Sequence, residues 1–286
     1  MPERVLITGG RGMLASYLSH TRDNDVLCAI RNELDIRNGE AFREYVLVNK
    51  VTAVINAAGL VGTGDAGNAL LIYTVNALSP YHMASICREL DILFVFISST
   101  RVFDGTKDNP YLESDNTNPL DDYGLSKLLG EDLVKNVMHD GRYYIIRLPQ
   151  ILGIRKRNED SLILYRLWKN ARETGKIHVA TDMYNSFSYA SDIASMTWDL
   201  IENKKSYGLY HLTNDGKASL FDLATYVFKL LNLNVEIIPV THDFFGEEKR
   251  KARCLAISSE KIKPGRHWKL AIKDFVEEWK AHIDEK

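Results

Sequence analysis

The chain has 286 residues, of which 45% are hydrophobic and 26% are charged, and its formal net charge at pH 7 is −2. This composition is ordinary for a globular protein and excludes the disordered and membrane-spanning classes. The near balance of charge excludes a broad basic surface for nucleic acid or for an anionic membrane. We therefore expect a few local residues to hold any anionic ligand.

The cysteines, the histidines and the N-terminus predict a cytoplasmic protein without disulfides or a metal site. Cys28, Cys87 and Cys254 lie far apart, and the eight histidines form neither an HExxH motif nor a cluster with cysteine. These spacings indicate no disulfide framework and no metal site. The N-terminus becomes glycine-rich too early for a signal peptide, and no apolar run approaches the roughly 18 residues of a membrane span. The cytoplasm is the expected location.

Short apolar runs alternate with helical stretches through the first half of the chain. The predicted strands are 4–8, 26–30, 51–56, 92–98 and 143–147, and the predicted helices begin at Gly12 or cover 39–49, 70–90 and the segment around 119–131. The run 92–97 is apolar throughout, which is typical of a parallel strand covered on both faces. The alternation predicts an α/β protein with a Rossmann-type doubly wound parallel sheet.

The pattern loosens after about residue 150. Helices are predicted at 162–173, 220–231 and 271–282, and strands at 176–180, 207–212 and 235–238, after a charged loop at 155–160. We expect residues 1–150 to form an NAD(P)-binding Rossmann domain. Residues 151–286 then form a smaller C-terminal α/β substrate lobe that is interleaved with the Rossmann sheet.

A glycine-rich turn follows the first predicted strand and opens a helix. In TGGRGMLA, Gly9 permits a tight turn, Gly12 lets the backbone approach a pyrophosphate, and Ala15 allows close packing of helix and sheet. After the second strand, Arg31 stands where NAD-binding proteins carry an acid, and it suits a 2′-phosphate together with Arg11. The sequence therefore favours NADP(H), with NAD(H) possible. The expected cofactor contacts are Gly9, Gly10, Arg11, Gly12, Met13, Leu14, Arg31, Asp35, Ile36, Ala57, Ala58, Gly59, Asn76, Tyr123, Lys127 and Arg147.

Three residues have the pattern of a proton-transfer site. Tyr123 and Lys127 are four residues apart, so on a helix they share one face. A nearby ammonium stabilises a phenolate and lowers the pKa of the phenol. Ser99 follows the strand 92–98, at the end where ligands bind to open parallel sheets, and its hydroxyl suits a substrate oxygen.

Together with these residues, several segments resemble a known family. They are VFDG at 102–105, the run 109–115 before Pro119, YGLSKLLGE at 123–131, Arg147, and GLYHL at 208–212. The chain resembles the extended short-chain dehydrogenase/reductases, and among them the dTDP-4-dehydrorhamnose reductases. That resemblance implies reduction of the 4-keto group of a nucleotide-linked deoxysugar by NADPH or NADH. It makes Tyr123 the proton donor and Ser99 the carbonyl polariser, while Lys127 binds the nicotinamide ribose and lowers the Tyr123 pKa.

The strand end departs from the usual Ser-Thr-Asp-Tyr of that branch. Ser99 replaces the threonine and keeps a hydroxyl, whereas Thr100 and Arg101 replace the Asp-Tyr pair. Dehydratases of the wider family place Asp-Glu there, so this chain lacks the groups for dehydration. Arg101 either pairs with a substrate phosphate or points into solvent.

The substrate contacts are expected largely from segments that resemble the family. The segment 185–194 resembles one that lines the sugar and starts a helix, with Ser191 or Asp192 near its N-cap. Arg250 and Arg253 precede a strand-like run at 254–257 and suit a diphosphate. Trp168, Tyr165 and Trp198 have helical spacing and are expected in the core. The expected substrate contacts are Val61, Thr100, Arg101, Val102, Asn185, Arg250 and Arg253.

The sequence favours an NADPH-preferring reductase of a nucleotide-linked 4-keto-deoxysugar, with a possible homodimer. An epimerase of the same superfamily would share Ser99, Tyr123 and Lys127 but would retain its cofactor and return the hydride. A non-catalytic NADP-binding regulatory subunit, like those of methionine adenosyltransferase, would keep the fold without turnover.

Overall fold

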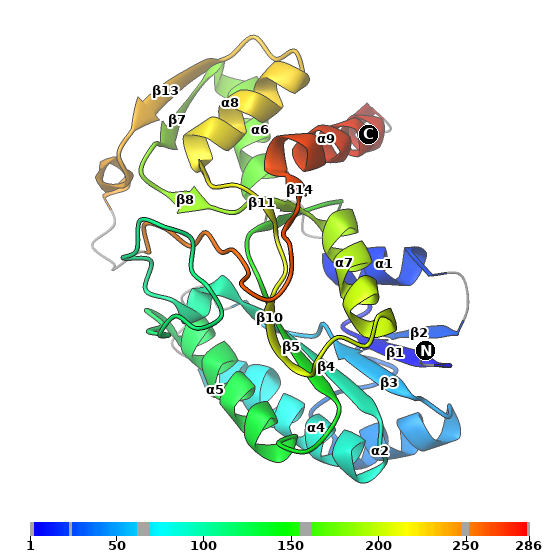
Figure 1. Ribbon diagram of the computed structural model, residues 1–286. Helices are drawn as coiled ribbons and strands as arrows, with labels where there is room; N and C mark the ends of the chain where they lie inside the picture. The colour runs from blue at the N-terminus through cyan, green and yellow to red at the C-terminus, as the bar shows by residue number, and fades with distance from the viewer. Residues whose placement is uncertain (1–2, 23–24, 62–68, 155–161, 247–251, 285–286) are drawn as a thin grey trace.

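The central feature is a parallel sheet. The computed structural model describes residues 3–22, 25–61, 69–154, 162–246 and 252–284 (Figure 1), and within these ranges the largest sheet has six strands in the order β10-β5-β4-β3-β1-β2, with parallel pairing throughout. The strands are β1 Val5–Thr8, β2 Val26–Ala29, β3 Ala53–Asn56, β4 Leu93–Ser99, β5 Tyr143–Leu148 and β10 Gly208–His211. The chain reverses its winding direction between β1 and β3, which is where open α/β sheets bind ligands. The predicted Rossmann-type fold is confirmed.

Helices cover both faces of this sheet. On one face lie α1 Met13–His20 and α7 Ala190–Glu202; on the other lie α2 Gly39–Val48, α4 Ser79–Glu89 and α5 Asp122–Val137 (Figure 1). Because successive side chains of a strand point to opposite faces, the sheet has one apolar core on each face. Val5 and Ile7 pack with α1 and α7, whereas Leu6 packs with α2 and α4. Both faces are buried, which explains why the strands are almost entirely apolar.

The second half of the chain contributes to both parts of the molecule. β10 pairs with β5 at the edge of the central sheet, and α7 packs against α1. The predicted interleaving is therefore present, and a division of the chain at residue 150 stays a prediction.

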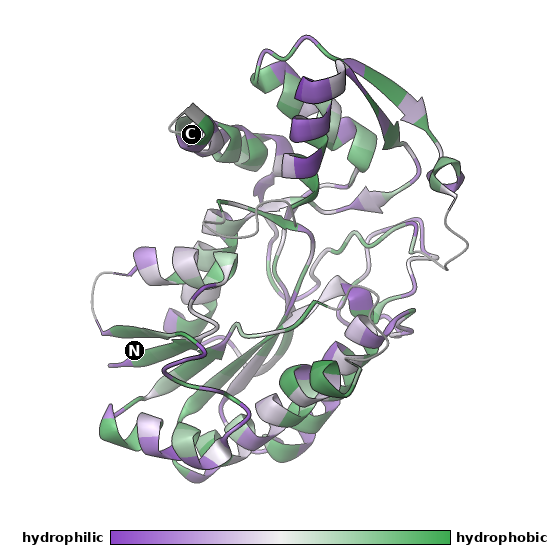
Figure 2. Ribbon diagram, turned by 180° about the vertical axis from the view of Figure 1, so that it is seen from behind, coloured by the Kyte–Doolittle hydropathy of each residue, from purple (hydrophilic) through white to green (hydrophobic). Residues whose placement is uncertain are grey.

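A smaller lobe is built around a third apolar core. It contains α6 Ile163–Thr174, α8 Leu220–Leu230 and α9 Trp268–Asp284 with the parallel pair β7 Lys176–Ala180 and β13 Glu236–Val240. Short strands complete it: β6 Ile151–Leu152, β8 Tyr184–Asn185, β9 Ser188–Tyr189, β11 Asn214–Asp215, β12 Ala218–Ser219 and β14 Gly265–His267. Figure 2 shows hydrophobic strands in the central sheet and hydrophilic turns on the outer helices. No helix in the described ranges is long and apolar enough to cross a membrane.

The helix predicted at 70–90 contains a local irregularity. It is divided into α3 Ala69–Tyr73, a π-helical turn η2 Thr74–Leu78, and α4. A π turn widens the helix and often occurs at functional sites. Asn76 lies in this turn and is fully buried.

One local prediction is wrong. The run 254–257 forms isolated bridges, Tyr184 with Cys254 and Tyr111 with Ile257, instead of a strand, because it passes between two segments without pairing along either. The helix predicted to start near Ser191 and Asp192 is confirmed: the N-cap of α7 is Tyr189, and both residues lie in the first turn. Trp198 is buried as expected, and Tyr165 and Trp168 pack partly buried against the lobe core.

Two glycines allow α5 to lie very close to its neighbours. A Cβ on Gly124 would lie 2.2 Å from the carbonyl oxygen of Arg101, and a Cβ on Gly130 would lie 2.4 Å from that of Asn76. Real Cβ atoms do not approach backbone oxygens this closely, so any side chain here would displace the helix. The position of α5 therefore depends on both glycines.

We expect Gly130→Ala to destabilise the protein by about 1–3 kcal/mol, because the added methyl group overpacks the contact between α5 and η2. Urea denaturation followed by circular dichroism measures this change. Gly39→Ala is the matched control, since the nearest atom to its Cβ would lie 4.0 Å away. Equal stabilities of the two variants would contradict the close packing.

Candidate active site

The candidate site lies at the carboxyl edge of the central sheet. There, β1 runs into the glycine turn, β3 into residues 57–60, and β4 into Ser99 and a short 3-10 turn, η3 Thr100–Val102. These strand ends adjoin one another because β4, β3 and β1 are neighbours in the sheet. The cofactor and proton-transfer residues predicted from the sequence therefore start from one edge.

The glycines of the glycine turn have no side chain that would keep a phosphate away from its backbone. Gly9 has φ +72°, and a Cβ on it would lie 2.8 Å from Cα of Ala58, so only glycine fits. The Gly12 N–H donates to the Gly9 carbonyl at 2.7 Å, which closes the turn. Helix α1 then begins at Met13 with no side-chain cap and no acid in its first turn. Its first N–H groups are thus available to an anion, and this arrangement fits a dinucleotide pyrophosphate.

Asn76 organises the loop after β3. Its Nδ2 donates to the Leu60 carbonyl at 2.8 Å and to Ser126 Oγ at 3.0 Å, and its Oδ1 accepts from the Leu60 N–H at 2.9 Å. Because the side chain is fully buried, Asn76 holds the loop 57–60 and has no exposed atom for a cofactor. This finding corrects the prediction of a direct contact.

The loop after β2 carries exposed positive charge. Arg31 is 67% exposed in its side chain and lies 3.7 Å from Asp35. Asp35 also accepts from Arg37, which together with Arg31 lowers the pKa of the carboxyl group to about 2. Ile36 belongs to the core and is 7% exposed. Arg31 is therefore the group at this strand end with freedom to meet a phosphate.

Ser99 and Tyr123 meet where β4 ends and α5 begins. Asp121 caps α5 by accepting from the Gly124 N–H at 2.8 Å, which places Tyr123 in the first turn. Burial raises the pKa of Tyr123 above its usual value, and this effect outweighs a hydrogen bond with Ser99 and the charge of Arg101, which both lower it. The phenol therefore keeps its proton at neutral pH and is a potential acid.

Lys127 lies one helical turn further along α5 and is 3% exposed. Its Nζ is 4.2 Å from the centroid of the Phe96 ring. Burial lowers the Lys127 pKa to about 7, although the Glu131 carboxylate opposes this shift. The charge that lowers the Tyr123 pKa here is that of Arg101, so an effect of Lys127 on the phenol stays a prediction.

A buried ion pair lies behind Lys127. Arg147 donates to Glu131 through Nε at 2.9 Å and through Nη2 at 2.7 Å, and Ser98 Oγ donates to the same carboxylate at 2.6 Å. Glu131 is fully buried and Arg147 is 2% exposed, so neither presents a surface to a ligand. Arg147 holds Glu131, and its contact with the cofactor stays a prediction. Glu131 belongs to the segment YGLSKLLGE, but the sequence does not identify its partner. Arg147 lies on β5, and only the packing of that strand brings it to Glu131.

The residues after Ser99 differ in their surroundings. Thr100 is 3% exposed, and Val102 is fully buried in a cluster with Phe103 and Leu255. The predicted substrate contacts of these two side chains stay predictions. The side chain of Arg101 is 50% exposed and forms an ion pair with Asp121. Asp121 is therefore a site residue that the sequence analysis missed, although an aspartate three residues before Gly124 is a helix-capping signal.

The motif VFDG at 102–105 has a structural role. Asp104 accepts hydrogen bonds from Tyr111 Oη at 2.7 Å and from Thr106 and Asn118, which lowers the pKa of its carboxyl group to about 2. Gly105 has φ +71°, and a Cβ on it would lie 2.4 Å from that of Ala252. The motif thus joins the loop after β4 to the segment beginning at 252.

The remaining predicted substrate residues are spread over the lobe. Val61 is exposed, and Asn185 accepts from the N–H groups of Gln150 and Ser186. Arg253 is 55% exposed and pairs with Asp182 and Asp243. Arg250 lies outside the described residues.

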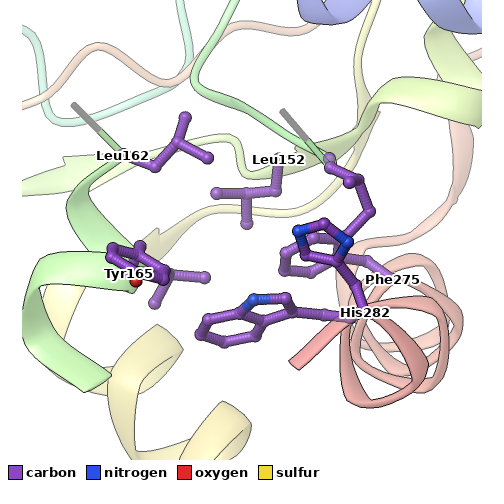
Figure 3. A pocket seen from close by; sticks show the side chains of 9 residues that line it. Leu152, Leu162, Tyr165, Phe275 and His282 are labelled. Atoms are coloured by element: carbon purple, nitrogen blue, oxygen red, sulfur yellow. The ribbon is translucent and has the colours of Figure 1, made fainter. Parts of the chain in front are cut away.

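An apolar cavity in the lobe does not belong to this site (Figure 3). Its volume is about 20 Å³, enough for about one water molecule and far too small for a nucleotide sugar. Figure 3 shows Leu152, Leu162, Tyr165, Phe275 and His282 around it. These residues share none with the site at the sheet edge, and the cavity is a packing gap between α6 and α9.

The chain is similar to known proteins over nearly its whole length. A family model described as the RmlD substrate binding domain matches residues 3–281. The dTDP-4-keto-6-deoxy-D-glucose reductase of Streptomyces niveus is 29% identical over 95% of this chain and 96% of that relative. The structure of a dTDP-4-dehydrorhamnose reductase from Clostridium acetobutylicum has a TM-score of 0.89 at 26% identity, and covers 97% of this chain and 99% of that chain. The Bacillus anthracis reductase in complex with NADP has a TM-score of 0.88 at 26% identity, over 97% and 100% of the two chains.

The burial of Lys127 predicts a pH-dependent stability. Because its pKa is about 7 in the folded protein, the unfolded chain binds more protons between pH 7 and pH 10. Stability attributable to this lysine therefore rises with pH across that window. We expect the unfolding free energy of the wild type, minus that of Lys127→Met, to increase by about 3 kcal/mol from pH 7 to pH 10 in urea denaturation.

The control is Lys229→Met, which removes an exposed lysine from α8. Its difference from the wild type should stay flat over the same pH range. A flat difference for Lys127→Met as well would show that the ammonium is not desolvated.

Proposed function

Because this chain belongs to the family of the RmlD substrate binding domain, we propose that it reduces the keto group of a nucleotide-linked deoxysugar with NADPH. The proposal is supported by the names of its relatives, which are reductases of dTDP-linked keto sugars. The observation that carries it is the placement of Ser99, Tyr123 and Lys127 beside the glycine turn at one sheet edge. The base, the sugar and the product stereochemistry are left open.

The proposed chemistry divides between the cofactor and the side chains. NADPH, when bound, supplies a hydride to the carbonyl carbon. Ser99 donates a hydrogen bond to the carbonyl oxygen and stabilises the negative charge that develops there. Tyr123 transfers its phenolic proton to that oxygen, which completes the alcohol. The raised pKa of Tyr123 keeps the phenol protonated before the reaction.

Lys127 supports this proton transfer in its charged form. A phenolate remains on Tyr123 after transfer, and an ammonium one helical turn away stabilises it. Glu131 favours the charged form of Lys127, while Arg147 and Ser98 hold Glu131 in place. We propose that Lys127 also binds the ribose of the cofactor, as the family resemblance implies.

The preference for NADP(H) rests on Arg31. Its exposed guanidinium follows β2, where the adenosine ribose lies in Rossmann-type sites. Arg11 lies in the exposed part of the glycine turn and adds a second cation. The diphosphate of the substrate is assigned to Arg253 and, outside the described residues, to Arg250. A homodimer and a cytoplasmic location stay predictions.

We expect Tyr123→Phe to lower kcat for keto-sugar reduction by about 10²–10⁴-fold, because the proton donor is lost. NADPH oxidation, followed by absorbance across dTDP-, GDP- and UDP-linked 4-keto sugars, measures this rate. The Kd for NADPH should stay within about threefold of the wild-type value, since the phenyl ring keeps the packing. Catalysis with no net NADPH consumption would instead indicate an epimerase. Absence of turnover by the wild type, with no effect of the substitution, would indicate a binding subunit.

We expect Arg31→Ser to weaken NADPH binding by about tenfold and to leave NADH binding nearly unchanged, because a charge-assisted bond to the 2′-phosphate is lost. Fluorescence titration with both cofactors measures the two Kd values. Arg88→Ser removes a cation that pairs with Asp140 and is the control for net charge. An equal loss for both cofactors would contradict the assignment of Arg31.

A further inference from the structure

Arg101 connects the two halves of the proton-transfer site. Its backbone N–H donates to Ser99 Oγ at 3.2 Å, so it orients the hydroxyl on the β4 side. Its carbonyl oxygen lies against Gly124, where a Cβ would be only 2.2 Å away. Its guanidinium pairs with Asp121, the N-cap of α5. Arg101 thus contacts Asp121 and Gly124, which lie on either side of Tyr123 in the sequence. It also contacts Ser99, the hydrogen-bond partner of Tyr123.

Asp121 makes this connection rigid. One carboxylate oxygen accepts from the Gly124 N–H at 2.8 Å, and the other accepts from Arg101. The bond to Gly124 fixes the first turn of α5, and the bond to Arg101 fixes the guanidinium beside that turn. The cation is therefore held near the phenol by the helix that carries the phenol.

We propose that Arg101 is a positioning residue for Tyr123, which it aligns through Asp121 and Ser99 and whose phenolate it stabilises by its charge. This inference rests on the proposed function only in taking Tyr123 as the proton donor. It adds to the roles expected from the sequence, because the guanidinium, although half of the Arg101 side chain is exposed, is paired with Asp121.

The elements that pack against α5 carry further ionisable groups: Tyr73 on α3, which donates to Asp122 at 3.1 Å, and Tyr81 and His82 on α4, which contact each other edge to face. Asp122 and Lys127 belong to α5 and Asp121 is its N-cap, while Arg101 belongs to η3. Arg101 is the charged residue whose effect on the Tyr123 pKa is resolved, and that effect is a lowering.

The test measures the ionisation of Tyr123 without turnover. Tyrosine labelled with ¹³C at Cζ is observed by NMR at pH 10.5, and the resonance absent from Tyr123→Phe identifies the residue. We expect Arg101→Gln to lower the ionised fraction by about threefold, because a stabilising cation is lost. Arg101→Lys should keep the wild-type fraction. Asp121→Asn keeps an N-cap oxygen but releases the guanidinium, so it should also lower the fraction.

Arg101→Lys distinguishes an electrostatic role from a loss of structure, since the ammonium keeps the charge that Arg101→Gln removes. Arg43→Gln, which breaks the distant pair with Glu89, is the control. Where Arg101→Gln does not fold, Arg101→Lys and Asp121→Asn decide the result. Equal fractions in all variants, or a fraction in Arg101→Lys as low as in Arg101→Gln, would overturn the inference.

Kinetics then separates the inference from the proposed function. With an active keto-sugar substrate, the alkaline limb of kcat should move to higher pH by about half a pH unit in both Arg101→Gln and Asp121→Asn, and should stay in place in Arg101→Lys. The expected NMR shifts without turnover on any keto-sugar nucleotide would reject the reductase and keep Arg101 as the residue that tunes Tyr123. Turnover with unmoved NMR fractions and pH limbs would reject Arg101 and keep the reductase.

Discussion

The close contact between α5 and the end of β4 is the constraint on which the site depends. The helix carries Tyr123 and Lys127, whereas the strand carries Ser99. The two come close because Gly124 lies against the Arg101 carbonyl just after β4, while Gly130 lets the helix approach the Asn76 carbonyl in η2. A displacement of even 1 Å would separate the hydroxyl from the phenol, and alignment on that scale has a large effect on rate. The packing of α5 near the end of β4 therefore determines whether Ser99 and Tyr123 are aligned, and the surrounding charges act on a pair that is already in place.

The same close packing creates an electrostatic cost. Lys127, Glu131 and Arg147 are all nearly or fully buried, and an isolated charge at any of these positions would shed its proton or gain one. Arg147 and Ser98 satisfy Glu131 with three hydrogen bonds, and Glu131 in turn opposes the desolvation of Lys127. The ion pair is thus best understood as support for a functional lysine, since buried pairs by themselves add little stability.

Local sequence signals predicted the elements well, and they placed the candidate catalytic residues on elements that adjoin one another in the structure. Apolar runs located the strands, and the order of Ser99, Tyr123 and Lys127 on strand and helix located the site. Contacts between segments that are distant in the sequence were harder to predict. The burial of Asn76 in a π turn, the pairing of Arg147 with Glu131, and the ion pair of Arg101 with Asp121 each join residues 16 to 50 positions apart. Spacing along one element cannot reveal such partners, because they depend on how separate elements pack.

The residue at 101 illustrates how a family site can change without losing its reaction. Thr100 stands where the family has an acid, and Arg101 adds a cation at the sheet edge that would, if unpaired, alter both substrate binding and the phenol. Asp121 pairs with that cation and also caps α5, so one carboxylate has two structural roles. Arg101, Asp121, Ser99 and Gly124 are therefore bonded to one another at the start of α5. Substrate selectivity in this chain has to arise around these contacts, which directs attention to the exposed side chains of the lobe and to Arg31.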